Sequence, residues 1–250
     1  MTAEIPADLT TSIVMSSFAF LVLTLIIINR AVNSLDMPKN KRLGISIAIT
    51  LVLVGWFSLV FVLGNNGFFA ETPLKVPTEF LIGTNIHVPN ILFTFLLIYG
   101  IIIIVFFSKI LQPVFDALPQ HWLIGIQTYR IVGYSFLTLY SMGLLPGEFA
   151  LPAGYGDMIV GFTAPLVAYL FFLKKPYSKM LAIAWNIIGI LDLVVAIGIG
   201  ILAYPLPFQV LSTEVSTEIF ALFPLVMIPA FAVPLAALLH LASLRVLLKK

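Results

Sequence analysis

The sequence predicts an all-α membrane protein, a bundle of seven transmembrane helices that form a single domain over residues 1–250. Of the 250 residues, 61% are hydrophobic and only 10% are charged, whereas about a quarter of the residues of a soluble domain are charged. The mean hydropathy is +1.12. Apolar runs of the length that crosses a bilayer, about 20 residues, recur along the chain.

Seven of these apolar runs are long enough to cross the membrane as helices. The N-terminus before the first run is acidic and lacks the basic region of a cleaved signal peptide, so we expect that run to be retained. Three prolines in the last run, Pro224, Pro229 and Pro234, predict a kinked helix. The predicted segments are Thr10–Val32, Leu43–Leu63, Ile91–Ile110, Leu123–Leu145, Gly154–Leu173, Met180–Leu202 and Ile219–Leu248.

Basic residues are concentrated at alternate ends of these segments, which predicts how the chain crosses the membrane. Cytoplasmic connections of membrane proteins are rich in lysine and arginine. The predicted orientation therefore places the N-terminus outside and the C-terminus in the cytoplasm. The basic set is Arg30, Lys39, Lys41, Arg42, Lys109, Lys174, Lys175, Lys179, Arg245, Lys249 and Lys250, and the opposite connections hold Lys75 with Glu4, Asp8, Glu71, Glu79, Glu148, Glu214 and Glu218.

Three ionisable residues, Arg130, Asp157 and Asp192, fall inside predicted spans. Such residues cost several kcal/mol in a bilayer and usually face the interior of the bundle. At about 1.5 Å per residue, Asp157 and Asp192 lie at about 20 Å and 18 Å from the cytoplasmic edge. The backbone of Arg130 lies about 8–10 Å below them, within reach of its long side chain. We therefore expect one polar cluster that holds all three residues.

The helical spacing of other polar residues supports a shared centre on the fourth, fifth and sixth spans. Gln127, Arg130 and Tyr134 follow steps of three and four residues, which places them on one face of an α-helix. Asn186 on the sixth span comes out at the level of Arg130. The predicted site therefore consists of Arg130, Asp157, Asp192, Asn186, Gln127 and Tyr134.

Two carboxylates beside one arginine cannot all remain ionised cheaply, which favours a site that binds a proton or a ligand. The function that follows is transport of a small solute or a proton through the polar centre. The alternative is a membrane sensor or accessory subunit, in which the buried charges only fix helix packing. An enzyme that acts on lipid has the least support, because no motif places a nucleophile beside a base.

The composition also argues against several cofactors and partners. The chain has no cysteine, and its three histidines, His87, His121 and His240, are far apart in sequence, so we expect neither a metal nor haem. His240 is expected near the membrane interface. After the sixth span the only lysines are Lys249 and Lys250, which leaves no residue for a retinal Schiff base. A net charge of +2 is too small to suggest nucleic acid. The expected partners are the lipid bilayer and a small molecule or proton.

The run Phe149-Ala-Leu-Pro-Ala-Gly-Tyr-Gly-Asp157, with Tyr129-Arg130 upstream, resembles a motif of uncharacterised bacterial integral membrane proteins. The resemblance covers the fourth and fifth predicted spans. It implies a bacterial inner membrane, and it implies no activity and no catalytic residues.

Overall fold

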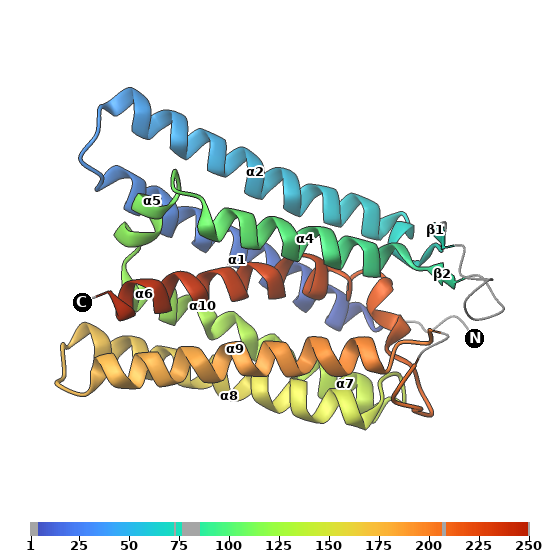
Figure 1. The fold of residues 1–250 in the computed structure, drawn as a ribbon. Coiled ribbons are helices and arrows are strands. Elements are labelled where there is room, and N and C mark those ends of the chain that lie inside the picture. The colour runs from blue at the N-terminus through green and yellow to red at the C-terminus, as the bar shows by residue number, and fades with distance from the viewer. Residues whose placement is uncertain (1–4, 73, 77–85, 207–208, 250) are drawn as a thin grey trace.

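The computed structural model describes residues 5–72, 74–76, 86–206 and 209–249, most of which are helical (Figure 1). Within these ranges, six helical segments are long and apolar enough to cross a membrane, so the protein is a multi-pass membrane protein. They are α1 (Ala7–Asn33), α2 (Lys39–Asn65), α4 (Asn90–Phe107), α8 (Gly147–Phe172), α9 (Ser178–Leu202) and the segment Ile228–Leu248.

The predicted fourth span is helical, but it is not a single α-helix. It consists of α6 (Gln120–Gly125), the 3-10 helix η2 (Ile126–Gly133) and α7 (Tyr134–Ser141). Gly125 is the last residue of α6 and Gly133 is the last residue of η2, and glycine has a low α-helical propensity. A 3-10 helix turns once every three residues, so the faces of this segment differ from those of an α-helix.

The last predicted span is irregular, as its prolines indicate. A short 3-10 helix, η3 (Thr217–Ala221), precedes the π-helix η4 (Ile228–Ala232) and α10 (Val233–Leu248). Pro234 has no N–H, so it cannot bond the carbonyl of Ala230 four residues earlier. The indole Nε1 of Trp56 on α2 donates to that carbonyl instead, at 2.9 Å. Side chains of other helices thus stabilise the irregular backbone.

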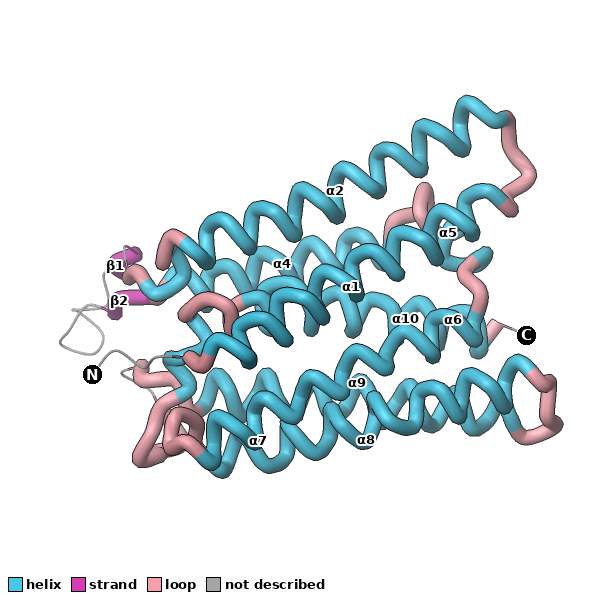
Figure 2. The backbone as a smooth tube through the Cα atoms, turned by 180° about the vertical axis from the view of Figure 1, so that it is seen from behind, coloured by secondary structure: helices cyan, strands magenta, loops and turns pink. Residues whose placement is uncertain are grey.

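The two ends of the helical bundle differ in the loops and the chain terminus that lie there (Figures 1 and 2). The α1–α2 turn, the α8–α9 turn and the C-terminus lie at one end, which we call the C-terminal end. The N-terminus and the hairpin of β1 (Leu74–Val76) and β2 (Ile86–Val88) lie at the other, the hairpin end. This antiparallel hairpin is a small departure from the predicted all-α fold.

The connections predicted to be cytoplasmic, including the basic turns around Lys39 and Lys174, all lie at the C-terminal end. Two short helices complete the described chain, η1 (Phe68–Ala70) near the hairpin and α5 (Gln112–Ala117) at the C-terminal end. Of the acidic residues assigned to the opposite end, Glu4 and Glu79 lie outside the described residues.

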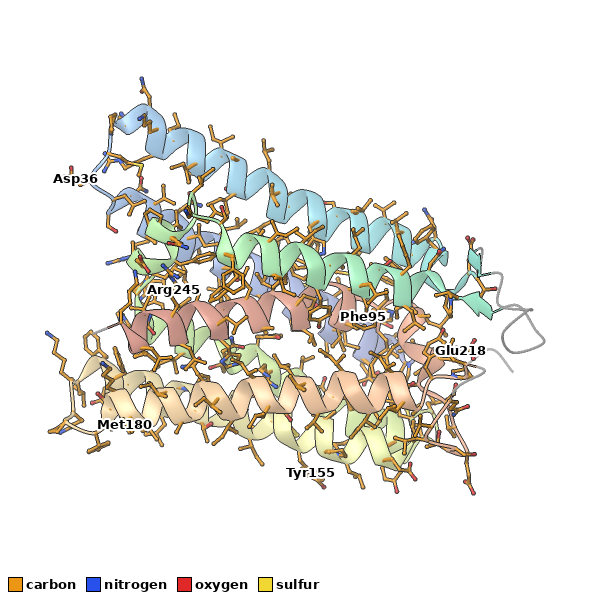
Figure 3. The ribbon with its side chains drawn as sticks, in the orientation of Figure 1. Asp36, Phe95, Tyr155, Met180, Glu218 and Arg245 are labelled. Carbon is orange, nitrogen blue, oxygen red and sulfur yellow. The ribbon has the colours of Figure 1, made fainter. Side chains whose placement is uncertain are left out.

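Large apolar side chains are exposed over the outer faces of α2, α4, α8 and α9, which suits contact with lipid. Leu51 on α2 and Leu96 on α4 are 67% and 77% exposed. Tyr155 on α8 and Met180 on α9 point away from the bundle (Figure 3). The main buried core instead lies between α1, α7, α8, η3, η4 and α10.

Candidate functional site: a buried charge cluster

Arg130 lies on η2 and is only 1% exposed, so its guanidinium is removed from both lipid and water. Its Nε donates to Asp157 Oδ1 at 2.6 Å, and its second terminal nitrogen donates to Asp192 Oδ2. The other terminal nitrogen donates to the carbonyl of Gly189 at 3.1 Å and lies 3.4 Å from His240 Nε2. One arginine therefore joins α8, α9 and α10.

The two carboxylates lie at the same depth in the bundle. At about 1.5 Å per residue, Asp157 on α8 and Asp192 on α9 are each about 15 Å from the end of their helix nearer the hairpin end. Half of a hydrocarbon core is also about 15 Å thick. The charges therefore lie near the middle of the membrane-spanning region, where an unpaired charge is most costly.

Glycines let the three backbones approach closely enough for these contacts. A Cβ at Gly161 on α8 would lie 2.6 Å from the backbone nitrogen of Ile131, so α8 packs directly against the backbone of η2. A Cβ at Gly156 would overlap Oδ1 of Asp192. Any larger residue at these two positions must displace backbone or charged atoms.

Hydrogen bonding fixes the protonation state of His240. Arginine is only a donor, so His240 Nε2 must accept. The ring's Nδ1 lies 2.9 Å from Oδ1 of Asn186, an acceptor, and so Nδ1 carries the proton. The Asn186 orientation is set by its Nδ2, which donates to the carbonyl of Ala182 at 2.8 Å. His240 is therefore neutral, and its ring connects Arg130 to Asn186 of α9 through hydrogen bonds.

The polar chain continues from Asn186 toward the C-terminal end. Asn186 Nδ2 also donates to Ser243 Oγ at 3.0 Å, and Ser243 Oγ donates to Gln120 Oε1 at 2.8 Å. The amide nitrogen of Gln120 has no hydrogen-bond partner among the described residues. A continuous row of side chains thus links the buried charges to the start of α6.

The cluster holds more carboxylates than cations. One guanidinium contacts two carboxylates, and no other charged side chain of the described chain forms an ion pair with any of them. Four of the five N–H groups of Arg130 already have acceptors. With both carboxylates ionised, the formal charge is about −1, and the arginine has little capacity left for another anion.

The structure brings together most of the residues predicted for the site. Arg130 contacts Asp157 and Asp192 directly, and Asn186 joins them through His240. Gln127 is fully buried, but its amide nitrogen donates to the carbonyl of Ala236 at 3.4 Å and lies outside the network. Its Oε1 has no partner among the described residues.

The structure does not bring Tyr134 to the charge cluster. Its side chain is 37% exposed, and its hydroxyl donates to Ser12 Oγ on α1 at 2.9 Å, away from the charges. The cause is the 3-10 helix η2. Four residues turn by about 40° beyond a full circle in an α-helix but by about 120° in a 3-10 helix. Tyr134 therefore rotates off the face that carries Arg130.

Sequence reasoning also misplaced His240 and missed Ser243 and Gln120. His240 was expected near the interface, but it is 1% exposed and hydrogen-bonded within the cluster's network. His240 and Ser243 are three residues apart, which places them on one helical face. That spacing is the signal that could have identified them. Among the residues that the structure describes, no group of three potential ligands could hold a metal ion.

These features define a class: a multi-pass helical membrane protein with a hydrogen-bonded charge cluster at mid-depth. A family model described as a domain of unknown function, DUF8737, matches residues 84–248, about two thirds of the chain. The chain therefore belongs to that family, and the expectation of a family without an assigned activity is confirmed. No curated protein and no solved structure matches it. The matched region contains every residue of the cluster and leaves out α1 and α2.

Proposed function

We propose that this protein is a transporter of the bacterial inner membrane, in which the Arg130–Asp157–Asp192 cluster binds and releases a proton or a cationic solute. The observation that carries the proposal is a single buried guanidinium shared by two carboxylates. The excess carboxylate must be neutralised in an apolar bundle by a proton or another cation. Intramembrane groups of this kind commonly mark ion pathways and proton relays.

The hydrogen bonding of Arg130 favours a cationic over an anionic cargo. Its donors are directed to Asp157, Asp192, His240 and the carbonyl of Gly189. An anion at this site would have to displace one of these four acceptors from Arg130, and it would be repelled by the carboxylates of Asp157 and Asp192. A proton or a cation would instead relieve that charge.

The polar row from His240 to Gln120 supports access from the C-terminal end. Buried polar groups normally have partners, and an unpaired one often marks an ordered water. The unpaired amide nitrogen of Gln120 lies at the end of this row. Water at this position would extend the row toward the basic end of the molecule.

For topology, we propose seven crossings with the N-terminus outside and the C-terminus in the cytoplasm. The segment from α6 to α7 supplies the seventh crossing. With about 2.0 Å per residue in η2 and 1.5 Å elsewhere, it is about 37 Å long, enough for a core of about 30 Å. The gathering of basic connections at the C-terminal end supports this orientation.

The alternative, a sensor or accessory subunit, is favoured by one observation. The guanidinium is almost fully satisfied within the bundle, as expected of a latch that holds η2 against α8 and α9. A latch keeps each carboxylate in one protonation state between about pH 4 and pH 9, so it gives no pH-dependent step in that range. The two functions therefore differ in whether the cluster exchanges a proton.

Proton exchange is tested first on the purified protein in detergent. Melting temperatures are measured between about pH 4 and pH 9 for the wild type, Asp157→Asn and Asp192→Asn, with Asp116→Asn as a control carboxylate outside the cluster. We expect a pH-dependent step in the wild type and in Asp116→Asn that Asp192→Asn lacks. Identical pH profiles for all four proteins would contradict proton exchange at the cluster.

Transport is then tested in liposomes that contain pyranine, a dye that reports internal pH, and valinomycin to set the voltage. A potassium gradient that makes the interior negative should acidify wild-type liposomes faster than protein-free ones. Asp192→Asn should remove that difference, while Asp116→Asn should keep it. Wild-type liposomes that behave as protein-free liposomes would refute proton transport.

A further inference from the structure

Cations gather at the C-terminal end of the bundle, and few anions balance them. The acidic residues at this end of the described chain are Asp36 and Asp116. Asp116 is already paired with Arg245 and Lys249, and Asp36 lies in the α1–α2 turn, apart from the α8–α9 turn (Figure 3). Arg30 and the lysines of the α8–α9 turn form no ion pair with any residue that the structure describes. They can therefore bind an anion from outside the chain.

The helix α6 joins some of these cations into one surface. The guanidinium of Arg30 on α1 lies over the ring of Trp122, 5.4 Å from its centroid. The ring of His121 lies 6.3 Å from that of Trp122 and 5.3 Å from that of Phe172, the last residue of α8. Lys174 follows two residues later, so cations from α1 and from the α8–α9 turn flank the aromatic rings of α6.

We call these residues the basic–aromatic surface, and they are Arg30, His121, Trp122, Phe172, Lys174 and Lys175. The turn that presents its two lysines has a defined backbone. Lys174 has a φ of +52°, the left-handed conformation in which many helices end. Its N–H donates to the carbonyl of Phe171 at 3.0 Å, and the side chains of Lys174 and Lys175 are both exposed. Glycine is the residue that this conformation favours, so the backbone does not require a lysine here.

The basic–aromatic surface continues directly into apolar residues at the membrane edge. Phe172 is 62% exposed and Leu173 is 43% exposed, and Tyr169 and Leu166 extend the exposed apolar stripe along α8. Basic residues at the ends of membrane-spanning helices attract anionic lipid headgroups, and tryptophan is enriched at the same level of the membrane. A lipid uses both parts of this surface, whereas a free phosphate or an acidic protein segment uses only the cations.

We infer that the basic–aromatic surface binds the headgroup of an anionic phospholipid. The phosphate lies between the guanidinium of Arg30 and the amino groups of Lys174 and Lys175, and the hydrocarbon chains follow the exposed side of α8. Arginine and lysine are the side chains that bind phosphate oxygens most strongly, and a ring N–H of His121 adds a further donor. A zwitterionic lipid has the same chains but brings a cation that this surface repels. The inference is independent of the proposed transport, because it uses no residue of the charge cluster.

The test uses the purified full-length protein in a neutral detergent and four probes. They are dioctanoyl phosphatidylglycerol (an anionic lipid), dioctanoyl phosphatidylcholine (zwitterionic, with the same chains), inorganic phosphate and a hexaglutamate peptide. Binding is measured by isothermal titration calorimetry. We expect phosphatidylglycerol to bind at least about tenfold more tightly than each of the other three, and its affinity to fall as salt screens the charges.

Two pairs of substitutions with the same change of net charge separate this surface from the general charge of the C-terminal end. A basic residue near a membrane surface strengthens the binding of anionic lipid about fivefold. Arg30→Gln combined with Lys174→Gly should therefore weaken the binding of phosphatidylglycerol about 25-fold. Lys39→Gln combined with Lys41→Gln, at the start of α2, should change it less than about twofold.

Lys174→Gly alone guards against a loss of folding, because glycine suits the left-handed conformation of this residue. We expect this variant to melt at or above the wild-type temperature and to bind phosphatidylglycerol about fivefold more weakly. Wild-type affinity in this variant would overturn the inference, as would equal losses in the two pairs or equal binding of the two lipids. Inorganic phosphate or hexaglutamate that binds as tightly as phosphatidylglycerol would also overturn it, in favour of a free anion or an acidic protein partner.

Discussion

Replacing Arg130 with methionine should be far more damaging than replacing either of its acidic partners with asparagine. Arg130→Met removes the only cation from a site that holds two carboxylates, and it removes four hydrogen bonds. Breaking a buried ion pair by removing one partner costs about 3–5 kcal/mol. We therefore expect Arg130→Met to lower the free energy of unfolding by at least about 3 kcal/mol at neutral pH.

Asp192→Asn should have a much smaller effect, because it converts the cluster into a neutral pair. The remaining bond between Arg130 Nε and Asp157 Oδ1, at 2.6 Å, balances one positive and one negative charge. The asparagine side chain keeps an oxygen that can accept from the guanidinium. We expect a change of no more than about 1 kcal/mol, comparable to one ordinary hydrogen bond.

The assay is reversible unfolding in mixed micelles with increasing dodecyl sulfate, monitored by tryptophan fluorescence. A double-mutant cycle combines Arg130→Met as one change with Asp157→Asn and Asp192→Asn together as the other. The combined variant has no charge at the site. We expect the combined variant to recover at least about 1.5 kcal/mol relative to additivity, within the range of coupled neighbours. If Asp192→Asn is as destabilising as Arg130→Met, both carboxylates are structural partners. The argument from excess charge would then fail.

Three further predictions concern helix packing, His240, and the ion pairs of Asp116 with Arg245 and Lys249. Gly161→Ala should cost about 1–3 kcal/mol, because its Cβ meets the backbone of η2, whereas Gly198→Ala, with nothing within 4 Å, should gain about 0.5–1 kcal/mol in the same unfolding assay. His240→Leu should cost about 1–3 kcal/mol, because it leaves the buried Asn186 oxygen without a donor; a melting temperature equal to that of the wild type would contradict the described network. Burial alone raises the pKa of Asp116, but hydrogen bonds and charges from the two basic side chains at the end of α10 lower it below its usual value. A lowered pKa stabilises the fold above the unfolded pKa of about 3.9 and is lost as the pH falls further. Because these groups are exposed, Asp116→Asn should cost at most about 1 kcal/mol at pH 7, and the cost should disappear as the pH falls through the lowered pKa of the folded protein, as melting over acid pH would show.

The positions of the long helices could be predicted closely because membrane spans are recognised by length and apolarity alone. The first span was predicted over Thr10–Val32 and observed as α1 over Ala7–Asn33. The last span begins at Ile228 rather than Ile219, and α8 begins at Gly147 rather than Gly154. Its glycines and Pro152 suggested a turn, but α8 continues through this proline, which lies inside the helix and removes one hydrogen bond.

The contact of Arg130 with Asp157 and Asp192 could be predicted from the depth of each residue in the membrane. That depth depends only on the residue number and on the rise per residue of a helix. The direction of each side chain could not be predicted in the same way, because it depends on the type of helix. Tyr134 was assigned to the site with an α-helical angle that η2 does not have. No residue type in η2 predicts a 3-10 helix. The tighter winding accompanies the close packing of η2 on Gly161, which is a contact between segments far apart in the sequence.

The helices outside the family match support the cluster without contributing to its charges. Phe20 of α1 stacks on Tyr129, with ring centroids 3.8 Å apart, on the residue before Arg130. Tyr129 in turn donates to the carbonyl of Ala232 in η4 at 3.3 Å, and Trp56 of α2 donates to that of Ala230. The first two helices thus hold the 3-10 helix and the π-helix in place from behind, while the charges face α8 and α9. A 3-10 helix is less stable than an α-helix, so the arginine's position depends on these contacts as well as on its own ion pairs.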